Sequence, residues 1–336
     1  MLLTNRGEVI IKVEGTPYTA ETLSDADHNI RINGIPEWSI NVAEYQRKIL
    51  DGTYDAWTSV MGKRSAQVTI RCDLTPGATV TTIPEFGKLL RISGWKETGW
   101  SGGTEVAVGS AVEGISYRPH AEYTHVPGTI DIQEIKEGVS ADMLVTKMKG
   151  CMAACKIMIG TVGEPVGLVL TISGSLVSIT DRAFAAKLDP TSMSTIVPPA
   201  LMGITTFSLG GVAQDIDSFE IDDGNDVAES PDPTAVGGIN GYYIGNRRMT
   251  MKMDPTLKLI AEEDFWGDLT GETTGALSIV LGSTPALSMS GPALQNISHE
   301  FPDRNGAILN SKTLLFTSNE GQSPNNIFEI LQGAKT

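Results

Sequence analysis

The residues with the most obvious chemistry are two histidines and a glutamate that lie close together in the chain. His120, Glu122 and His125 offer two ligand types that zinc accepts, but the segment supplies no fourth ligand. Cys151 and Cys155 lie four residues apart, and an extended strand would separate them by ~13 Å, too far for a chelating pair. We therefore interpret the histidine segment as surface polar residues of an edge strand and the cysteines as small buried residues.

No motif for nucleotide binding accompanies these residues. The chain contains neither a phosphate-binding loop (G-x-x-x-x-G-K-S/T) nor a dinucleotide fingerprint (G-x-G-x-x-G). Its four histidines, at positions 28, 120, 125 and 299, are scattered and suggest no Ser/His/Asp arrangement. The run from Asp222 to Asp226 lacks the residue order and the distal glutamate of a calcium-binding loop, so we interpret it as a strand-end turn. The sequence predicts no enzyme, no cofactor and no metal.

Composition favours a mainly β protein with an acidic surface. The 336 residues include 36 glycines and 17 prolines but only 6% aromatic residues, a mixture typical of short strands and many turns. The formal net charge is −15, from 40 acidic and 25 basic residues, which argues against a DNA-binding surface. Three cysteines without framework spacing predict reduced thiols and synthesis in a cytoplasm. We expect no signal peptide and no membrane-spanning segment.

The stretch from Lys147 to Ile179 predicts the central element of the fold, a β-hairpin. Side chains from Met152 to Ile159 alternate between two faces, and a second apolar run extends from Val166 to Val177. Turn residues separate the two runs over positions 160–165. Because both faces are fairly apolar, we expect the hairpin to be buried between layers or between subunits.

A helix is predicted beside the strands of the first half. Thr82 and Glu85 have the spacing of a capping box, and they precede an apolar stripe that includes Phe86 and Leu90. Gly94 follows the stripe and can close the helix.

The second half repeats signals of the first half. Gly62-Lys63-Arg64 matches Gly245-Asn246-Arg247 at an offset of 183 (247 minus 64). At an offset of 179, Ser39-Ile40-Asn41-Val42 matches Ser218-Phe219-Glu220-Ile221, and Phe86 and Leu90 match Phe265 and Leu269. A period this long indicates duplicated domains rather than a solenoid. We therefore predict an N-terminal domain over residues 1–180, a linker over 181–199 and a C-terminal domain over 200–336.

Taken in order, both halves resemble the tail tube proteins of long-tailed phages (siphophages). The resemblance rests on the segments DRAFAAKLDP, SFEIDDGND, YYIGNRRMTMKMDP, EEDFWGDLTGETTGALSIVLG and LQNISHEFPDRNGAILNSKTLLF. It implies a mainly β fold of two tandem β-sandwich or barrel-like domains, each with one flanking α-helix. It also implies a structural virion protein that self-assembles into stacked rings, the channel for genome ejection.

The resemblance implies partners as well. These are further copies of the chain, other tail proteins such as the tape measure, terminator and baseplate, and double-stranded DNA that passes through the lumen without specific binding. Rings of single-domain relatives have six subunits, so two domains per chain predict a ring of three chains. The expected location is the virion tail, after synthesis in the host bacterium. The alternative interpretation is a two-domain β-sandwich adhesin or a baseplate binding module.

A contact between rings is predicted for the loop over residues 50–62. This loop carries Tyr54, Trp57 and Met61 among glycine and aspartate residues, and large apolar side chains in such a loop often mark contact surfaces. The alternative is that the loop folds back onto its own domain. The corresponding loop over residues 225–241 is polar and contains two prolines, so the two halves present different loops at equivalent places.

The acidic excess predicts a lumen that does not hold DNA. DNA binding depends on basic residues that neutralise phosphates, and every copy would repeat the excess of acids. The alternative is that the excess acidic residues lie on the outer surface and serve solubility alone. The candidate lumen-facing residues are Asp131, Glu134, Glu137, Asp217, Glu220 and Asp222.

Overall fold

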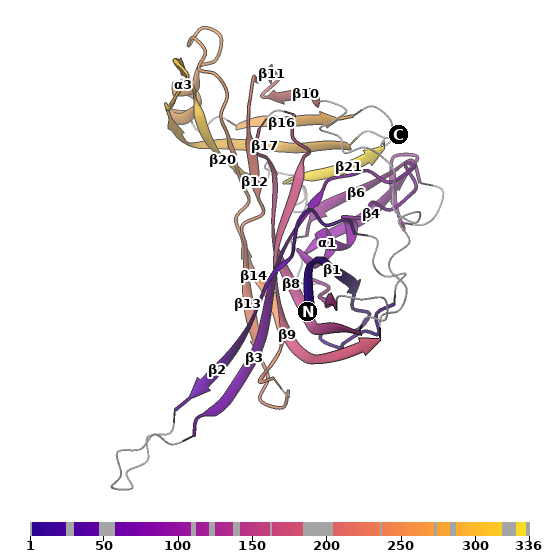
Figure 1. Ribbon diagram of the computed structural model, residues 1–336. Coiled ribbons are helices and arrows are strands. Elements are labelled where there is room, and N and C mark those ends of the chain that lie inside the picture. The colour runs from indigo at the N-terminus through magenta and orange to yellow at the C-terminus, as the bar shows by residue number, and fades with distance from the viewer. Residues whose placement is uncertain are drawn as a thin grey trace, which may run out of the picture.

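The computed structural model describes residues 2–24, 30–46, 58–108, 112–120, 125–136, 142–161, 163–183, 204–235, 237–271, 274–282, 287–317 and 327–333. In these ranges the chain is mainly β, with long antiparallel strands and two short helices (Figure 1). The mainly β fold class predicted from the sequence is therefore confirmed. No helix in these ranges is long and apolar enough to cross a membrane.

The first half is organised around one antiparallel run of six strands, in the order β1–β7–β8–β9–β3–β2. The predicted hairpin is confirmed as β8 and β9, whose residues pair along most of both strands with two register shifts. The elements are β1 (Leu2–Val13), β2 (Glu37–Tyr45), β3 (Val60–Asp73), α1 (Gly87–Ile92), β4 (Trp95–Ser101), β5 (Thr104–Val106), β6 (Gly114–Pro119), β7 (Gly128–Lys136), β8 (Asp142–Ile159) and β9 (Gly167–Ala183).

The second half contains a run with the same construction, in the order β10–β16–β17–β20–β15–β12. Corresponding strands also follow one another in the same order along the chain, with α1 and α3 at the same point. The elements are β10 (Ile204–Leu209), β11 (Val212–Ala213), β12 (Phe219–Asp222), β13 (Asn225–Pro231), β14 (Ile239–Arg247), β15 (Thr250–Met253), α3 (Phe265–Thr270), β16 (Thr274–Leu281), β17 (Leu287–Glu300), β18 (Asp303–Arg304), β19 (Ala307–Ile308), β20 (Ser311–Phe316) and β21 (Glu329–Gly333).

Strand register gives a single offset for one long hairpin in each half. Val42 pairs with Arg64 in the first half, and Asn225 pairs with Arg247 in the second, so both strands are shifted by 183 residues (225 minus 42, 247 minus 64). A β-bulge follows at the same place in both hairpins. The sequence match of Ser39 with Ser218 is therefore wrong by four residues, because a similar tetrapeptide recurs out of register.

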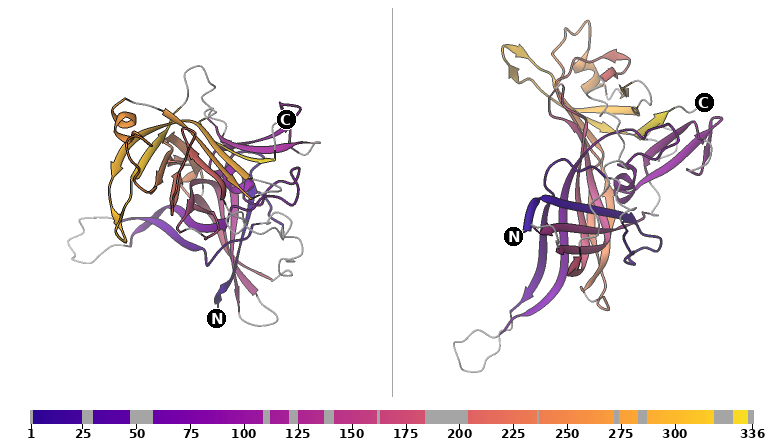
Figure 2. Two further views of the ribbon diagram at one scale, coloured as in Figure 1. Left: turned by 90° about the horizontal axis from the view of Figure 1, so that it is seen from above. Right: turned by 45° about the vertical axis from the view of Figure 1, so that its right-hand side comes forward.

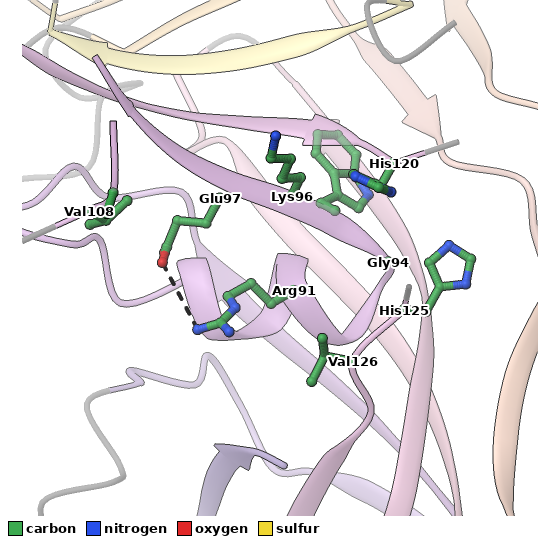
Figure 3. A pocket seen from close by; sticks show the side chains of 10 residues that line it. Arg91, Gly94, Lys96, Glu97, Val108, His120, His125 and Val126 are labelled. Carbon is green, nitrogen blue, oxygen red and sulfur yellow. Dashed lines mark ion pairs between the residues drawn. The ribbon is translucent and has the colours of Figure 1, made fainter. Parts of the chain in front are cut away.

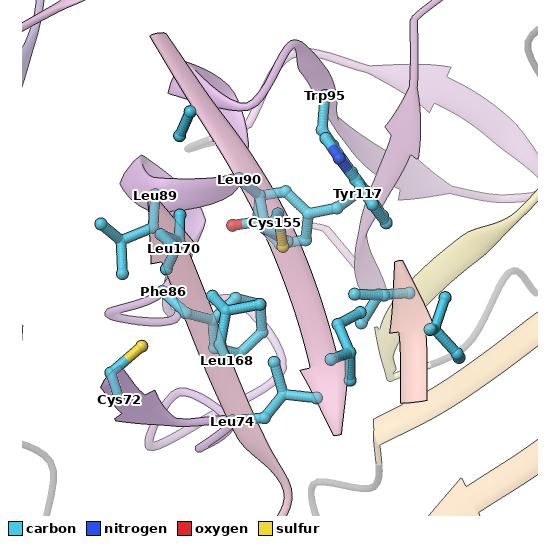
Figure 4. Packing of buried hydrophobic residues seen from close by; sticks show 14 of the residues in the cluster. Cys72, Leu74, Phe86, Leu89, Leu90, Trp95, Tyr117, Cys155, Leu168 and Leu170 are labelled. Carbon is cyan, nitrogen blue, oxygen red and sulfur yellow. The ribbon is translucent and has the colours of Figure 1, made fainter. Parts of the chain in front are cut away.

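The β8–β9 hairpin supplies the centre of the core. Cys155 and Ile157 on β8 face the same interior as Leu168 and Leu170 on β9, and all four side chains are at most 1% exposed. Leu89 and Leu90 of α1, with Phe86 just before it, cover this face (Figure 4). One apolar cluster continues from here into the second half. Burial of each such side chain stabilises the fold by about 1.5–3 kcal/mol.

The first helix begins later than the capping box predicts. Its N-cap is Phe86, without a side-chain cap, and the Thr82 hydroxyl instead lies 2.8 Å from that of Thr79. Pro84 and Glu85 lie in a turn, closed by the Gly87 amide on the Pro84 carbonyl. The second helix is capped by the Asp264 side chain, which accepts from the Gly267 amide at 2.9 Å.

The boundary between the halves falls partly outside the described residues. β9 continues through Ala183, so the first three residues of the predicted linker, 181–183, are strand and pair with the start of β8. Residues 184–199 of the predicted linker lie outside the described ranges.

Candidate assembly interface

The two halves are joined edge to edge by β8 and β12. β7 pairs with β8 only as far as Cys151, and β12 takes over the same edge of β8 from Lys156 to Ile159. The Lys156 ammonium lies 2.9 Å from Glu220 and 3.1 Å from Asp222, and these contacts with β12 raise its pKa. Strand addition of this kind satisfies backbone donors and acceptors that an open edge would leave exposed.

A buried polar cluster fixes the junction beside the end of α1. The Arg247 guanidinium donates to Asn225 Oδ1 at 2.7 Å and to the Ser93 carbonyl at 2.8 Å. Asn225 Nδ2 in turn donates to the Ser93 carbonyl at 2.9 Å and to the Ala153 carbonyl on β8 at 3.0 Å. Two side chains of the second half thus satisfy carbonyls of the first, and this fixes the angle between the halves.

Asp223 completes this cluster with a buried carboxyl group. It is 1% exposed, its amide donates to the Cys155 carbonyl at 3.0 Å, and its Oδ2 accepts from Asn225 Nδ2 at 2.7 Å. Burial raises its pKa to about 7, against the opposing effects of hydrogen bonds and of the nearby Arg247. Burial also lowers the pKa of Arg247, but a guanidinium remains charged at any ordinary pH.

The β13–β14 hairpin extends from this junction across the outer face of the first half. Ile239, Tyr242 and Ile244 form a small apolar cluster with Met152 of β8. Gly150, with φ +58°, allows the close approach, because a Cβ atom there would lie 2.6 Å from the Gly241 Cα. The sequence interpretation of residues 225–241 as a polar loop is therefore wrong: most of the segment is a hairpin whose apolar face is buried against β8.

The counterpart of this arm in the first half is β2–β3, and it projects from the body of the molecule (Figures 1 and 2). The apolar side chains along it are exposed: Ile40, Val42, Tyr45, Val60 and Met61. Among the described residues, β2 pairs only with β3.

The counterpart of the β8 edge begins at the end of β17, because strand pairing makes His299 the equivalent of Cys155 and Glu300 the equivalent of Lys156. β16 pairs with β17 only as far as Gln295, and β20 occupies the opposite edge. In the described part of the chain, no strand pairs with the β16-side edge from Ile297 to Glu300. Among the described residues, β2 and the end of β17 are thus left open, and they correspond to the two strands joined at β12 and β8.

The residues predicted to make contacts between rings are only partly described. Met61 lies on β3 opposite Glu44 and is 58% exposed, as a contact residue of the projecting arm would be. Tyr54 and Trp57 lie outside the described residues.

The predicted acidic residues do not form one free acidic face. Asp131 is buried, which raises its pKa, and Glu134 accepts a hydrogen bond from the Trp38 indole at 3.0 Å. Asp217 lies 2.9 Å from the Arg304 guanidinium. Glu220 and Asp222 share Lys156, as described above, and Glu137 lies outside the described residues.

The histidine segment lines a cavity of about 470 Å³ beside the end of α1 (Figure 3). His120 and His125 face it together with Arg91 and Lys96, and burial together with Arg247 lowers the pKa of His125. Glu122 lies outside the described residues. Among the described residues, no three histidine, cysteine or acidic side chains are placed to hold a metal ion. Cys151 and Cys155 are buried free thiols whose pKa values burial raises.

One segment of the first half has the spacing of a catalytic motif. Gly99-Trp100-Ser101-Gly102-Gly103 has the spacing of a nucleophile elbow, G-x-S-x-G. Such an elbow needs a sharp turn from a strand into a helix, whereas here Ser101 ends β4 and the glycines turn back into β5. The segment is therefore a β-hairpin turn.

Sequence reasoning missed the polar cluster at the junction. Asp223 and Asn225 were interpreted as turn residues, and only the match of Arg64 with Arg247 pointed toward the cluster. Comparison with known proteins does not assign the chain to a family. No protein-family model matches the chain, and no curated protein matches its sequence.

Proposed function

We propose that this chain is a structural protein whose copies join through their open strand edges into rings, which stack into the tail tube of a long-tailed phage. The observation that carries the proposal is the β8–β12 junction, whose two counterparts, β2 and the end of β17, are open in the described chain. A β2 strand that adds to the β17 edge of a second copy repeats the internal junction. The resemblance of both halves to tail tube proteins supports the identity of the assembly.

The repeat also sets the expected size of the ring. An interface between two different surfaces, one at each end of the chain, generates a closed ring when its rotation closes. If six equivalent domains complete the circle, three junctions lie within chains and three lie between them. The expected ring therefore contains three chains.

The proposed tube carries DNA without binding it. Each chain contributes a formal charge of −15, so a ring of three is strongly acidic. The described candidates Glu220 and Asp222 share a lysine, which leaves this face less acidic than the sequence suggests. A lumen that holds few basic side chains would release few counterions from DNA and retain it weakly.

Electron microscopy and sedimentation of the purified chain test the proposal. The chain should form tubes or rings, and Val42→Asp, which places a charge on the apolar face of β2, should leave folded monomers. Ile83→Asp is the matched control, because Ile83 is also exposed and apolar but lies outside both edges. A chain that remains monomeric at every concentration, and binds glycan in that form, would favour the adhesin alternative.

A further inference from the structure

A second feature of the open end is an acidic cavity of about 300 Å³ beside α3. Asp264 and Asp268 of the helix segment line it, together with Asn296 of β17 and Thr274 at the start of β16. Asp264 already accepts a hydrogen bond from Gly267 within the helix. Burial, with the negative charges of Asp264 and Glu263 nearby, raises the pKa of Asp268.

An unpartnered oxygen indicates that this cavity receives a donor. Asn296 is 8% exposed, and its buried Oδ1 has no hydrogen-bond partner among the described residues. A buried acceptor without a donor costs about 1–3 kcal/mol. Carboxylates accept hydrogen bonds as well, so the cavity suits a cation that donates several of them.

The cation that fits is organic rather than a metal ion. No three acidic, histidine or cysteine side chains in the described ranges are placed to hold a metal. Of the two other acids that line the cavity, Glu263 accepts from the buried Lys312 ammonium and from Gln214 at 3.4 Å, and Glu262 accepts from the Leu259 amide at 3.4 Å. A guanidinium, with five donors in a planar fork, can reach a carboxylate and an amide oxygen together.

The internal repeat places an arginine at this position. Arg64 and Arg247 are equivalent at the offset of 183. Arg247 donates to the Ser93 carbonyl at the end of α1 and to Asn225, which in turn donates to the Ala153 carbonyl. Strand pairing makes Asn296 the equivalent of Ala153. Ala153 pairs with a β9 residue whose partner on β3 is known. Asn296 pairs with a β20 residue whose partner on β15 is the equivalent of that β3 residue at the offset of 183. The site that Arg247 occupies within the chain therefore corresponds to the neighbourhood of the acidic cavity.

We propose that Arg64 of one copy inserts into this cavity on a second copy and donates to Asp268 and to Asn296 Oδ1. The inference rests on the proposed assembly and specifies its electrostatic contact. Arg64 is exposed in the single chain, so it is available to a second copy.

The countercharges support this pairing. At the internal junction the countercharge is Asp223, on the same arm as Arg247, and its equivalent on β2 is the apolar Ile40. Aligning the helix N-caps Phe86 and Asp264 makes Asp268 the equivalent of Leu90, one residue away from the sequence match of Leu90 with Leu269. The negative charge thus lies on the receiving helix rather than on the arm. No side-chain partner of Arg64 is found among the described residues, and a second copy would supply one at α3.

Charge exchange between two positions tests the contact. Arg64→Glu should raise the concentration needed for assembly at least about tenfold, while Arg71→Glu, an equal change at an exposed site on the same strand, should not. Combining Arg64→Glu with Asp268→Arg should restore assembly. Circular dichroism confirms that each variant is folded.

Disulfide trapping supplies a second readout. Arg64→Cys and Asp268→Cys variants, mixed and oxidised, should form a covalent dimer that neither forms alone, because the native cysteines are buried. If the wild-type chain assembles and Arg64→Glu assembles as readily as Arg71→Glu, with no dimer trapped, this contact is wrong and the proposed function stands. If the wild-type chain does not assemble at all, both fail.

Discussion

Replacing Asp223 with asparagine should remove one component of the pH dependence of this fold's stability. The carboxyl group is 1% exposed, and burial raises its pKa from the ordinary value of 3.8 to about 7. A group with a raised pKa stabilises the folded state below its unfolded pKa, and that contribution is lost as the pH rises through the folded pKa. A shift of this size corresponds to about 4 kcal/mol, lost between about pH 4 and pH 7.

Chemical denaturation of the unassembled chain at a series of pH values measures this effect. The difference in unfolding free energy between the wild-type chain and Asp223→Asn should fall steadily from pH 4 to pH 8. Asp226→Asn controls for the loss of one acid, because Asp226 is exposed on the same arm. A difference that stays flat across this range would refute the assignment of a buried, titrating carboxyl group to the junction.

Two further substitutions test the same junction. Arg247→Ala removes the donor that satisfies the Ser93 carbonyl and leaves a buried carboxyl group nearby, so it should lower the unfolding free energy by about 3–5 kcal/mol. The control Arg248→Ala, at an exposed site, should change the unfolding free energy by less than about 0.5 kcal/mol. Equal losses in thermal or chemical melts would show that the cluster is not structural. Gly224→Ala places a Cβ atom against the Arg248 carbonyl at φ +60° and should lower the unfolding free energy by more than about 2 kcal/mol. The control Gly34→Ala, at φ +86° with open space around it, should lower the unfolding free energy by only about 1 kcal/mol. A Gly224 variant as stable as the Gly34 variant would contradict the close approach.

The sequence predicts the parts of this fold that depend on local pattern. The β8–β9 hairpin alternates in hydrophobicity around a glycine and proline turn, so its existence and position follow from period two alone. The repeat is visible because Arg64 and Arg247 keep their neighbours. The helix start was mispredicted because Thr82 and Glu85 have cap spacing, yet the intervening Pro84 turn delays the first helical residue to Gly87.

The candidate site depends on contacts that no local pattern records. Asp223 and Asn225 have the composition of a turn, and they are buried only because β8 and the end of α1 approach from the first half. The hairpin of β13 and β14 is polar along one face, so its role becomes visible only when Met152 is seen beneath it. The register of the repeat also depends on contacts between strands, because the offset of 183 follows from paired residues rather than from similar tetrapeptides.

A reconstruction of the assembled particle would show directly how the copies join. Cryo-electron microscopy of tubes formed by the purified chain should show three chains in each ring, with β2 of one chain added at the end of β17 of the next. The β2–β3 arm should lie across the neighbouring second half as β13–β14 lies across the first. Rings of six chains, or a β2 edge exposed to solvent in the assembled particle, would contradict the account.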